Sequence, residues 1–261
     1  MKKTGYVALG ALIVALVLFI SGTMMGGFDE LETLYHKGDF NVDWPFDRLK
    51  DATEEFRDIK NLEIHGEGGN VELIEYDGTT IKVVAQNISS RVKIGNEPDT
   101  LVIKNTFRFL SIANINDVGT DLKIYVPRDY QFNHVSLEVD AGVFTVPALK
   151  AEKIEIDVDA GSFEADKLTA AYTKVEVDAG DVNISYLNSN YSVFDCDVGN
   201  IDVMMSGSES DYSYSTKCDV GDVNIGNYHS EGLSDEHQSH GGPRKIEADC
   251  DAGSITIKME V

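Results

Sequence analysis

A motif of aspartate, a small apolar residue and glycine recurs six times in this chain, and its spacing constrains the fold more than any other feature. The motif aspartates are Asp140, Asp159, Asp178, Asp197, Asp219 and Asp251, and the motif glycines are Gly142, Gly161, Gly180, Gly199, Gly221 and Gly253. Three consecutive steps of 19 residues separate the first four aspartates, and the next two steps are 22 and 32 residues. A fixed period of this length is typical of repeat architectures, in which each unit stacks on its neighbours.

The residues on either side of each motif alternate between apolar and polar. In the unit at 174–185, Val175 and Val177 alternate with charged residues before the motif, and Val182 and Ile184 alternate with polar residues after it. Period-two alternation predicts strands with one buried face. We therefore predict an all-β fold, a β-solenoid or β-roll of stacked 19-residue coils with two strands each and a thin apolar core. The alternative is a β-sandwich, because a unit of this length also accommodates a hairpin.

The motif itself has the composition of a tight corner. An aspartate side chain can accept a hydrogen bond from the backbone N–H two residues on, and glycine adopts backbone angles that other residues reach only at a cost. We therefore assign the six motif aspartates and six motif glycines a structural role at turns. We expect the alanine or valine between them to face the core.

Further acids beside the motif make calcium the cation to consider, because Ca²⁺ prefers carboxylate oxygens. The calcium candidates are Asp178, Asp181, Asp197, Asp219 and Asp222. The repeat does not match the glycine-rich nonapeptide that binds calcium in other solenoids. Our leading expectation is no metal and no other cofactor, with a calcium-stabilised solenoid as an alternative.

Three cysteines and three histidines lie in the last third of the chain. Cys196, Cys218 and Cys250 fall where other units have valine, so we expect free, buried thiols; a disulfide between neighbouring coils is the alternative. Residues 226–244 have the composition of a surface loop, with folding over the final edge strand as a second option. His229, His237 and His240 lie in this segment, and a zinc or copper site there is the alternative to a solvated loop.

The charge balance and the absence of catalytic motifs exclude several classes of protein. The formal net charge is −23, which argues against nucleic acid as a partner because phosphate binding needs clustered lysine and arginine. The sequence contains no Gly-x-Ser-x-Gly, no His-Glu-x-x-His and no phosphate-binding loop. Its acids repeat with the structure, so no pair stands out as a glycosidase pair. We expect no catalytic residues and no enzyme.

The N-terminus has the pattern of a membrane anchor. Lys2 and Lys3 precede 22 uncharged residues at 4–25, which as a helix would extend about 33 Å and span a bilayer. The expected layout is a cytoplasmic tip at 1–3, a transmembrane signal-anchor at 4–25, a stalk or cap with short helices at 26–60, and an extracytoplasmic β-repeat domain at 61–261. A cleaved signal peptide is the alternative. The chain is therefore expected in the cell membrane, with its N-terminus in the cytoplasm.

The segments before the regular repeat carry weaker patterns. Residues 45–56, PFDRLKDATEEF, have helical spacing. Residues 61–126 are expected to form strands with turns at 66–69, 77–78 and 95–96, and Pro127 is expected to end a strand. The segment GGNVELIEYDG at 68–78 resembles a degenerate first coil.

The stretch LKIYVPRDYQFNHVSLEVDAGVFTV, followed by the regular coils, resembles a known family. It is the "putative adhesin" domain of unknown function with β-strand repeats, and it is similar to the LiaG-like membrane-anchored proteins of cell-envelope stress operons in Firmicutes. The resemblance covers residues 55–261 and implies a β-solenoid-like fold outside the cytoplasm, with no catalytic residues to transfer.

These observations lead to one expected function and one alternative. We expect a non-enzymatic interaction module at the bacterial cell envelope, which modulates an envelope-stress sensor through a protein partner. The alternative is an adhesin or a domain that binds cell-wall glycan. An exposed aromatic row would favour the alternative, and the tyrosines that could form it are Tyr186, Tyr191, Tyr212, Tyr214 and Tyr228. We expect instead that these tyrosines cap the core at the coil ends.

Overall fold

The computed structural model describes residues 50–88, 93–97, 99–105, 121–231 and 235–260. All of them belong to one unit, residues 47–261. The predicted anchor at 4–25 and most of the predicted stalk lie outside the described residues. In the part that is described, no helix has both the length and the apolar character needed to cross a bilayer.

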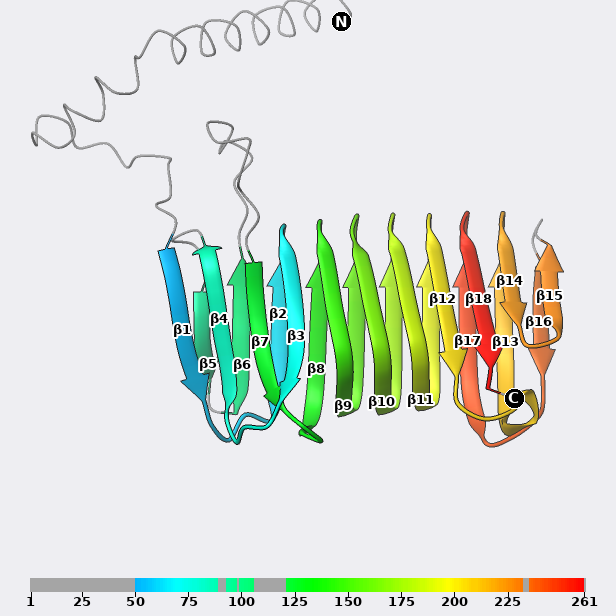
Figure 1. The fold of residues 1–261 in the computed structure, drawn as a ribbon. Coiled ribbons are helices and arrows are strands. Elements are labelled where there is room, and N and C mark those ends of the chain that lie inside the picture. The colour runs from blue at the N-terminus through cyan, green and yellow to red at the C-terminus, as the bar shows by residue number, and fades with distance from the viewer. Residues whose placement is uncertain (1–49, 89–92, 98, 106–120, 232–234, 261) are drawn as a thin grey trace, which may run out of the picture. The chain divides into compact units, whose positions relative to one another are not determined.

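The strands stand side by side in two layers (Figure 1). In spatial order, layer A holds β5 (Lys93–Glu97), β6 (Thr100–Asn105), β2 (Asn61–Gly66), β8 (Gln131–Val139), the C-terminal halves of β9 (Val143–Val158), β10 (Ser162–Val177) and β11 (Asp181–Cys196), then β17 (Arg244–Cys250), β13 (Tyr212–Cys218) and β16 (Asp235–Ser239). Layer B holds β1 (Lys50–Phe56), β4 (Ile81–Ile88), β7 (Asp121–Pro127), β3 (Asn70–Tyr76), the N-terminal halves of β9, β10 and β11, then β12 (Asn200–Met205), β18 (Ser254–Met259), β14 (Asp222–Ile225) and β15 (Tyr228–Glu231). A short 3-10 helix, Glu209–Asp211, follows β12.

The pairing register in the middle of the molecule equals the sequence repeat. Ser162 of β10 lies opposite Val143 on one side and Asp181 on the other, and all three strands run parallel. Each neighbour is therefore one 19-residue step away, which confirms the β-solenoid and its coil length. The β-sandwich alternative is wrong, because a hairpin in each unit would have made these neighbours antiparallel.

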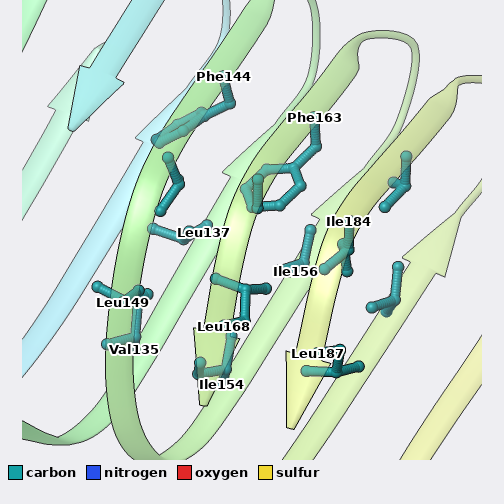
Figure 2. Packing of buried hydrophobic residues seen from close by; sticks show 14 of the residues in the cluster. Val135, Leu137, Phe144, Leu149, Ile154, Ile156, Phe163, Leu168, Ile184 and Leu187 are labelled. Atoms are coloured by element: carbon teal, nitrogen blue, oxygen red, sulfur yellow. The ribbon is translucent and has the colours of Figure 1, made fainter. Parts of the chain in front are cut away.

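Inward side chains of successive coils stack in columns between the layers (Figure 2). Phe144 and Phe163 lie one above the other with ring centroids 6.2 Å apart. Leu149, Leu168 and Leu187 form a second column, and each is at most 3% exposed. Burying a leucine or phenylalanine contributes about 1.5–3 kcal/mol, and each added coil repeats that contribution.

The order of the coils in space departs from their order in the chain at the C-terminal end. Strand β17 pairs in parallel with β11 on one side and β13 on the other. Strand β18 lies likewise between β12 and β14. The chain thus leaves one coil position open after residue 205, builds the coil at 212–225 beyond it, and returns to fill the open position with residues 244–259. We call residues 244–259 the inserted coil.

Antiparallel strands close both ends of the stack. Strands β1, β4 and β5 pair antiparallel at one end, and β15 and β16 do so at the other. Unpaired strand edges invite pairing with other chains, and such terminal strands limit it. The prediction that residues 226–244 form a loop is therefore wrong for β15 and β16. The second option holds, since these strands cover the edges of β14 and β13.

Two other local predictions are wrong. Residues 50–56, expected in a helix, form strand β1, because pairing with the edge of β4 overrides the helical spacing. Gly95 and Asn96, expected in a turn, lie inside β5; the turn comes later, at Asp99, which has a φ of 95°. Other expectations hold: β7 ends at Pro127, and β3 pairs in parallel with β9 as a first coil should.

Candidate interaction surface

The six motif glycines form a column at one edge of the stack. A Cβ atom placed on any of them would lie 2.1–2.9 Å from the carbonyl oxygen of the glycine in the neighbouring coil. Only Gly142 and Gly199 among the six have a positive φ between 20° and 160°. Close approach of stacked backbones therefore explains glycine at most of these corners, and the conformational reason that we expected applies to two of them.

The six motif aspartates lie beside the glycines and direct their side chains outward. Their backbone N–H groups bond to carbonyls of the neighbouring coil, as in Asp159 N–H to Val139 O at 3.0 Å and Asp178 N–H to Val158 O at 3.0 Å. None of the six carboxylates accepts a hydrogen bond from a backbone N–H of a described residue, so the turn that we expected from the aspartate side chain is not what shapes the corner. The backbone ladder shapes it, and the carboxylates remain available to solvent.

The residue between each motif aspartate and glycine is exposed, which corrects the expectation that it faces the core. Val198 is 55% exposed and Val220 is 57% exposed. The alanines at these positions are exposed as well. The bend begins at the aspartate, so the alternation of the preceding strand stops one residue earlier than the sequence pattern indicates.

A second row crosses the outside of layer A, two residues before each motif aspartate, and five of the six residues at these positions are acids. In spatial order the row consists of His65, Glu138, Asp157, Glu176, Asp195, Asp249 and Lys217, each opposite the next across neighbouring strands. We call the five acids the carboxylate ladder. Neighbouring strands are about 4.8 Å apart, so the five acids form one line. His65 lies at one end of this line and Lys217 at the other.

The ends and the middle of the carboxylate ladder differ electrostatically. His65 Nδ1 contacts Glu138 Oε2 at one end, and Lys217 Nζ lies 3.1 Å from Asp249 Oδ1 at the other. In the middle, partial burial and then the charge of Glu176 raise the pKa of Asp157 to about 6. Burial and then Asp249 also raise the pKa of Asp195. Asp157 and Asp195 therefore hold protons more tightly than ordinary carboxylates do.

A shallow hollow of about 550 Å³ lies over the inserted strand β17 at the end of the ladder. Its lining includes Val193, the acids Asp195, Glu236, Glu247 and Asp249, and the basic residue Lys217. Three consecutive residues of β16, Glu236 to Gln238, also line it. The hollow therefore continues the charged surface at the end of the ladder.

The metal candidates are not brought together. Among the residues that the structure describes, no three histidine, cysteine, aspartate or glutamate side chains are close enough to hold a metal ion. Asp181 accepts a hydrogen bond from Asn200 Nδ2 at 2.7 Å. His229 bonds to Asn224, and the His237 ring stacks on Tyr228 at 4.2 Å. His240 lies beyond β16, and the motif aspartates stay in their column.

The three cysteines occupy one buried column, in the order Cys196, Cys250, Cys218. All three are free and buried, as we predicted from the valines at equivalent positions. Burial raises the pKa of Cys196 to about 12 and that of Cys218 to about 11. They are therefore thiols at neutral pH. The sequence did not reveal that Cys250 lies between the other two.

The tyrosines divide into two groups. Tyr212 and Tyr214 are buried, as expected for residues that cap the core. Tyr191 is partly exposed and meets Tyr172 edge to face, with ring centroids 5.4 Å apart. Lys153 Nζ lies 5.8 Å from the Tyr172 ring. We did not single out Tyr172 from the sequence, although it lies one 19-residue step before Tyr191.

Arg244 is a structural residue that the sequence analysis missed. It begins the inserted coil and donates from Nε and Nη2 to Ser189 O at 2.9 and 2.6 Å, and from Nη1 to Ser206 O at 2.8 Å. Its guanidinium lies 4.4 Å from the Tyr212 ring centroid. It thus satisfies carbonyls where the chain leaves the regular path. Its only sequence signal is its position at the start of the last unit.

The fold described above defines a class, a β-solenoid of parallel two-strand coils with glycine corners. Within this class the chain belongs to the Toastrack DUF4097 family, whose profile matches residues 59–203, more than half of the chain. This match confirms the predicted resemblance as far as a β-solenoid-like domain of unknown function. Membership of the LiaG-like group stays a prediction. No curated protein matches the chain.

Several solved structures are similar in fold. A "putative cell adhesion protein" from Clostridium sporogenes has 15% identity and a TM-score of 0.48, with 82% of this chain and 100% of that chain covered. A "putative adhesin" from Bacteroides fragilis has 14% identity and a TM-score of 0.43, with 83% and 99% covered. A "putative lipid binding protein" from Parabacteroides distasonis has 12% identity and a TM-score of 0.33, with 82% and 97% covered. These values are too low to carry an argument about function.

Proposed function

We propose that this protein is a non-enzymatic interaction module of the bacterial cell envelope, anchored in the membrane by residues 4–25 and folded outside the cytoplasm. Its partner is a protein with a basic surface, and its role is to modulate an envelope-stress sensor. The apolar segment after Lys2 and Lys3 supports the anchoring. It keeps the domain near the membrane surface, where such a sensor lies.

The observation that carries the proposal is the carboxylate ladder. Five acids stand in register on one outward face, and the core uses none of them. A line of like charges without a structural role is unfavourable in isolation, and a basic partner offsets the repulsion. Repeat domains with long regular faces commonly bind through them.

The arrangement of the acids also supports a non-enzymatic role. Catalytic pairs of carboxylates need one group in an environment unlike that of the other. Here Asp157, Glu176 and Asp195 occupy equivalent positions in successive coils. Equivalent positions favour a binding surface over a reaction centre.

A second candidate function is binding of cell-wall glycan. Tyr172 and Tyr191 favour it, because they form a partly exposed aromatic pair on successive coils, and aromatic rings stack on sugar faces. The pair is edge to face, and Tyr191 Oη also donates to Glu247 Oε1 at 2.7 Å. The pair is therefore a short contact site, and the ladder remains the larger surface.

Crosslinking in living cells tests the proposal. The full-length protein is captured after crosslinking, and its partners are identified by mass spectrometry. One membrane protein recovered in near-equal amount is the expected result. Recovery of wall fragments alone, or of nothing specific, overturns the proposal and favours glycan binding.

Two charge-matched variants show whether the ladder is the contact surface. The first replaces the middle of the ladder by Asp157→Asn, Glu176→Gln and Asp195→Asn. The second removes three exposed acids elsewhere by Glu164→Gln, Asp166→Asn and Asp202→Asn. We expect the first variant to lose the partner and the second to retain it. Equal capture by both variants contradicts the assignment of the ladder.

A further inference from the structure

We propose that the carboxylate ladder shares protons between neighbouring coils and thereby makes the domain more stable at mildly acidic pH than at neutral pH. This property belongs to the domain itself and goes beyond the proposed binding function, since it requires no partner. It would let an envelope protein respond to acidification of its surroundings.

The geometry of the ladder provides the first argument. Glu138, Asp157 and Glu176 lie opposite one another on three successive parallel strands. Like charges directly opposite on neighbouring strands destabilise the pairing. One proton between two such carboxylates replaces repulsion with a hydrogen bond to a charged acceptor, which is stronger than a neutral one.

Asp157 lacks a compensating partner, and Asp195 likewise has no hydrogen bond or ion pair among the described residues. The charged groups that face it are Lys153, Glu155 and Asp159 on its own coil, Glu138 and Asp140 on the coil before, and Lys174, Glu176 and Asp178 on the coil after. Lys153 Nζ lies 2.7 Å from Glu155 and Lys174 Nζ lies 2.5 Å from Glu176, so both cations are already paired. In the described part of the chain, Asp157 has no hydrogen bond and no ion pair of its own.

The proton affinities agree with this geometry. Burial first, and then the neighbouring carboxylates, raise the pKa of Asp157 from 3.8 to about 6. The same causes raise the pKa of Asp140 and of Asp195. At the ends of the ladder, Glu138 and Asp249 have a histidine and a lysine beside them.

The direction of the pH effect follows from linkage. A carboxyl whose pKa is higher in the folded than in the unfolded state binds more protons when folded. The contribution of Asp157 to the free energy of unfolding is fully present below its unfolded pKa of 3.8. It is lost as the pH rises through its folded pKa of about 6. Glu155 acts in the opposite sense: although burial opposes the shift, bonds with Lys153 and His134 lower its pKa. Its contribution is lost only as the pH falls through that lowered value, so stability should rise from neutral pH to about pH 5.

Thermal unfolding of the full-length chain in detergent micelles tests the inference. The melting temperature, followed by circular dichroism, should rise by about 2–4 °C between about pH 7.5 and about pH 5. The variant Asp157→Asn should melt at a higher temperature than the wild type at neutral pH and should lose most of the rise. Asp195→Asn serves as a second ladder variant should the first fail to fold, and it should also reduce the rise.

Glu164→Gln is the matched control. It removes one exposed carboxylate from the same set of coils but from layer B, outside the ladder. It should leave the rise unchanged. A melting temperature that stays constant or falls between neutral pH and about pH 5 overturns the inference, and so does an equal effect of ladder and control variants.

Discussion

Two regions of the stack share the same aspartate-glycine corner, namely the regular coils of β9 to β11 and the C-terminal end. They differ in how the chain connects one coil to the next. In the regular coils the strand after each corner continues through the far side of the stack into the next coil. At the C-terminal end, the spatial neighbours of Ser254 are Asn200 and Asp222, and both precede it by more than one repeat. The motif therefore determines a local bend, and it leaves open which coil lies next to which.

The irregular end carries additional contacts that the regular coils do not need. In an unbroken strand, the backbone carbonyls are bonded to the neighbouring strands along its length, as in β10 between β9 and β11. Where β12 ends and β17 begins, carbonyls of Ser189 and Ser206 depend on Arg244. An interrupted chain path therefore requires a charged side chain, here Arg244, to bond the carbonyls at the interruption.

Removal of the inserted coil should have the largest effect on this comparison. A chain stopped after residue 243 loses the parallel pairing partners of β13 and β14 and the buried side chains of β17 and β18. We expect β13 to β16 to exchange amide hydrogens almost as fast as an unfolded chain, while β9 and β10 keep their protection, because repeats depend on their neighbours. Hydrogen exchange with mass spectrometry measures this. Protection of β13 equal to that of β10 would show that the inserted coil is dispensable.

Substitution of a corner glycine should lower the free energy of unfolding by a similar amount in both regions. Gly199→Ala places a Cβ 2.1 Å from Gly180 O, and Gly221→Ala places one 2.2 Å from Gly253 O. We expect each variant to lose about 3 kcal/mol of the free energy of unfolding, at the upper end of single-substitution effects. Urea unfolding gives the value. Val198→Ala, at an exposed neighbour, should stay within about 0.5 kcal/mol of the wild type, and a large loss in that control would remove the glycine argument.

Arg244→Ala should destabilise only the irregular end, by about 2 kcal/mol, because it leaves buried carbonyls without a charged donor. Arg244→Lys should recover part of this loss, since an ammonium group cannot bond both carbonyls as a guanidinium fork does. Lys245→Ala, at the next residue and exposed, is the control. It should change the free energy of unfolding by less than about 0.5 kcal/mol. Full recovery by lysine would mean that charge alone explains the role of Arg244.

The cysteine column should show the smallest effect. Cys250→Val puts into the inserted coil the residue that the regular coils carry at this position, and we expect a change below about 1 kcal/mol. Cys250→Ser should cost more, because it buries a hydroxyl among apolar neighbours. Denaturant unfolding provides the comparison. A serine variant as stable as the valine variant would show that the column tolerates polar groups.

The sequence predicted what local chemistry determines. The 19-residue period predicted parallel coils in register, and the valines at 139, 158 and 177 predicted the burial of the cysteines. Both follow from side-chain alternation, which depends only on near neighbours in the chain. The carboxylate ladder was also present in the sequence, as an acid two residues before five of the six motif aspartates, but we did not recognise it.

The parts that the sequence did not predict depend on distant contacts. Residues 50–56 and 235–239 became strands because open edges were available to them. Val198 and Val220 are exposed because the bend begins at the preceding aspartate. The alternation of apolar and polar residues alone predicts the start of the bend one residue too late. The position of the inserted coil depends on a gap left by earlier residues, and no short motif encodes a gap.

The inserted coil also has a consequence for biosynthesis. A chain is made from its N-terminus, so residues 244–259 emerge after both of the coils that they separate. Until then the coils at 181–205 and 212–225 each present an unpaired edge. The inserted coil therefore closes an internal gap, whereas an ordinary repeat protein adds each new unit at the outside. A product terminated early would retain two open edges on its surface, and proteases and chaperones would meet these edges first.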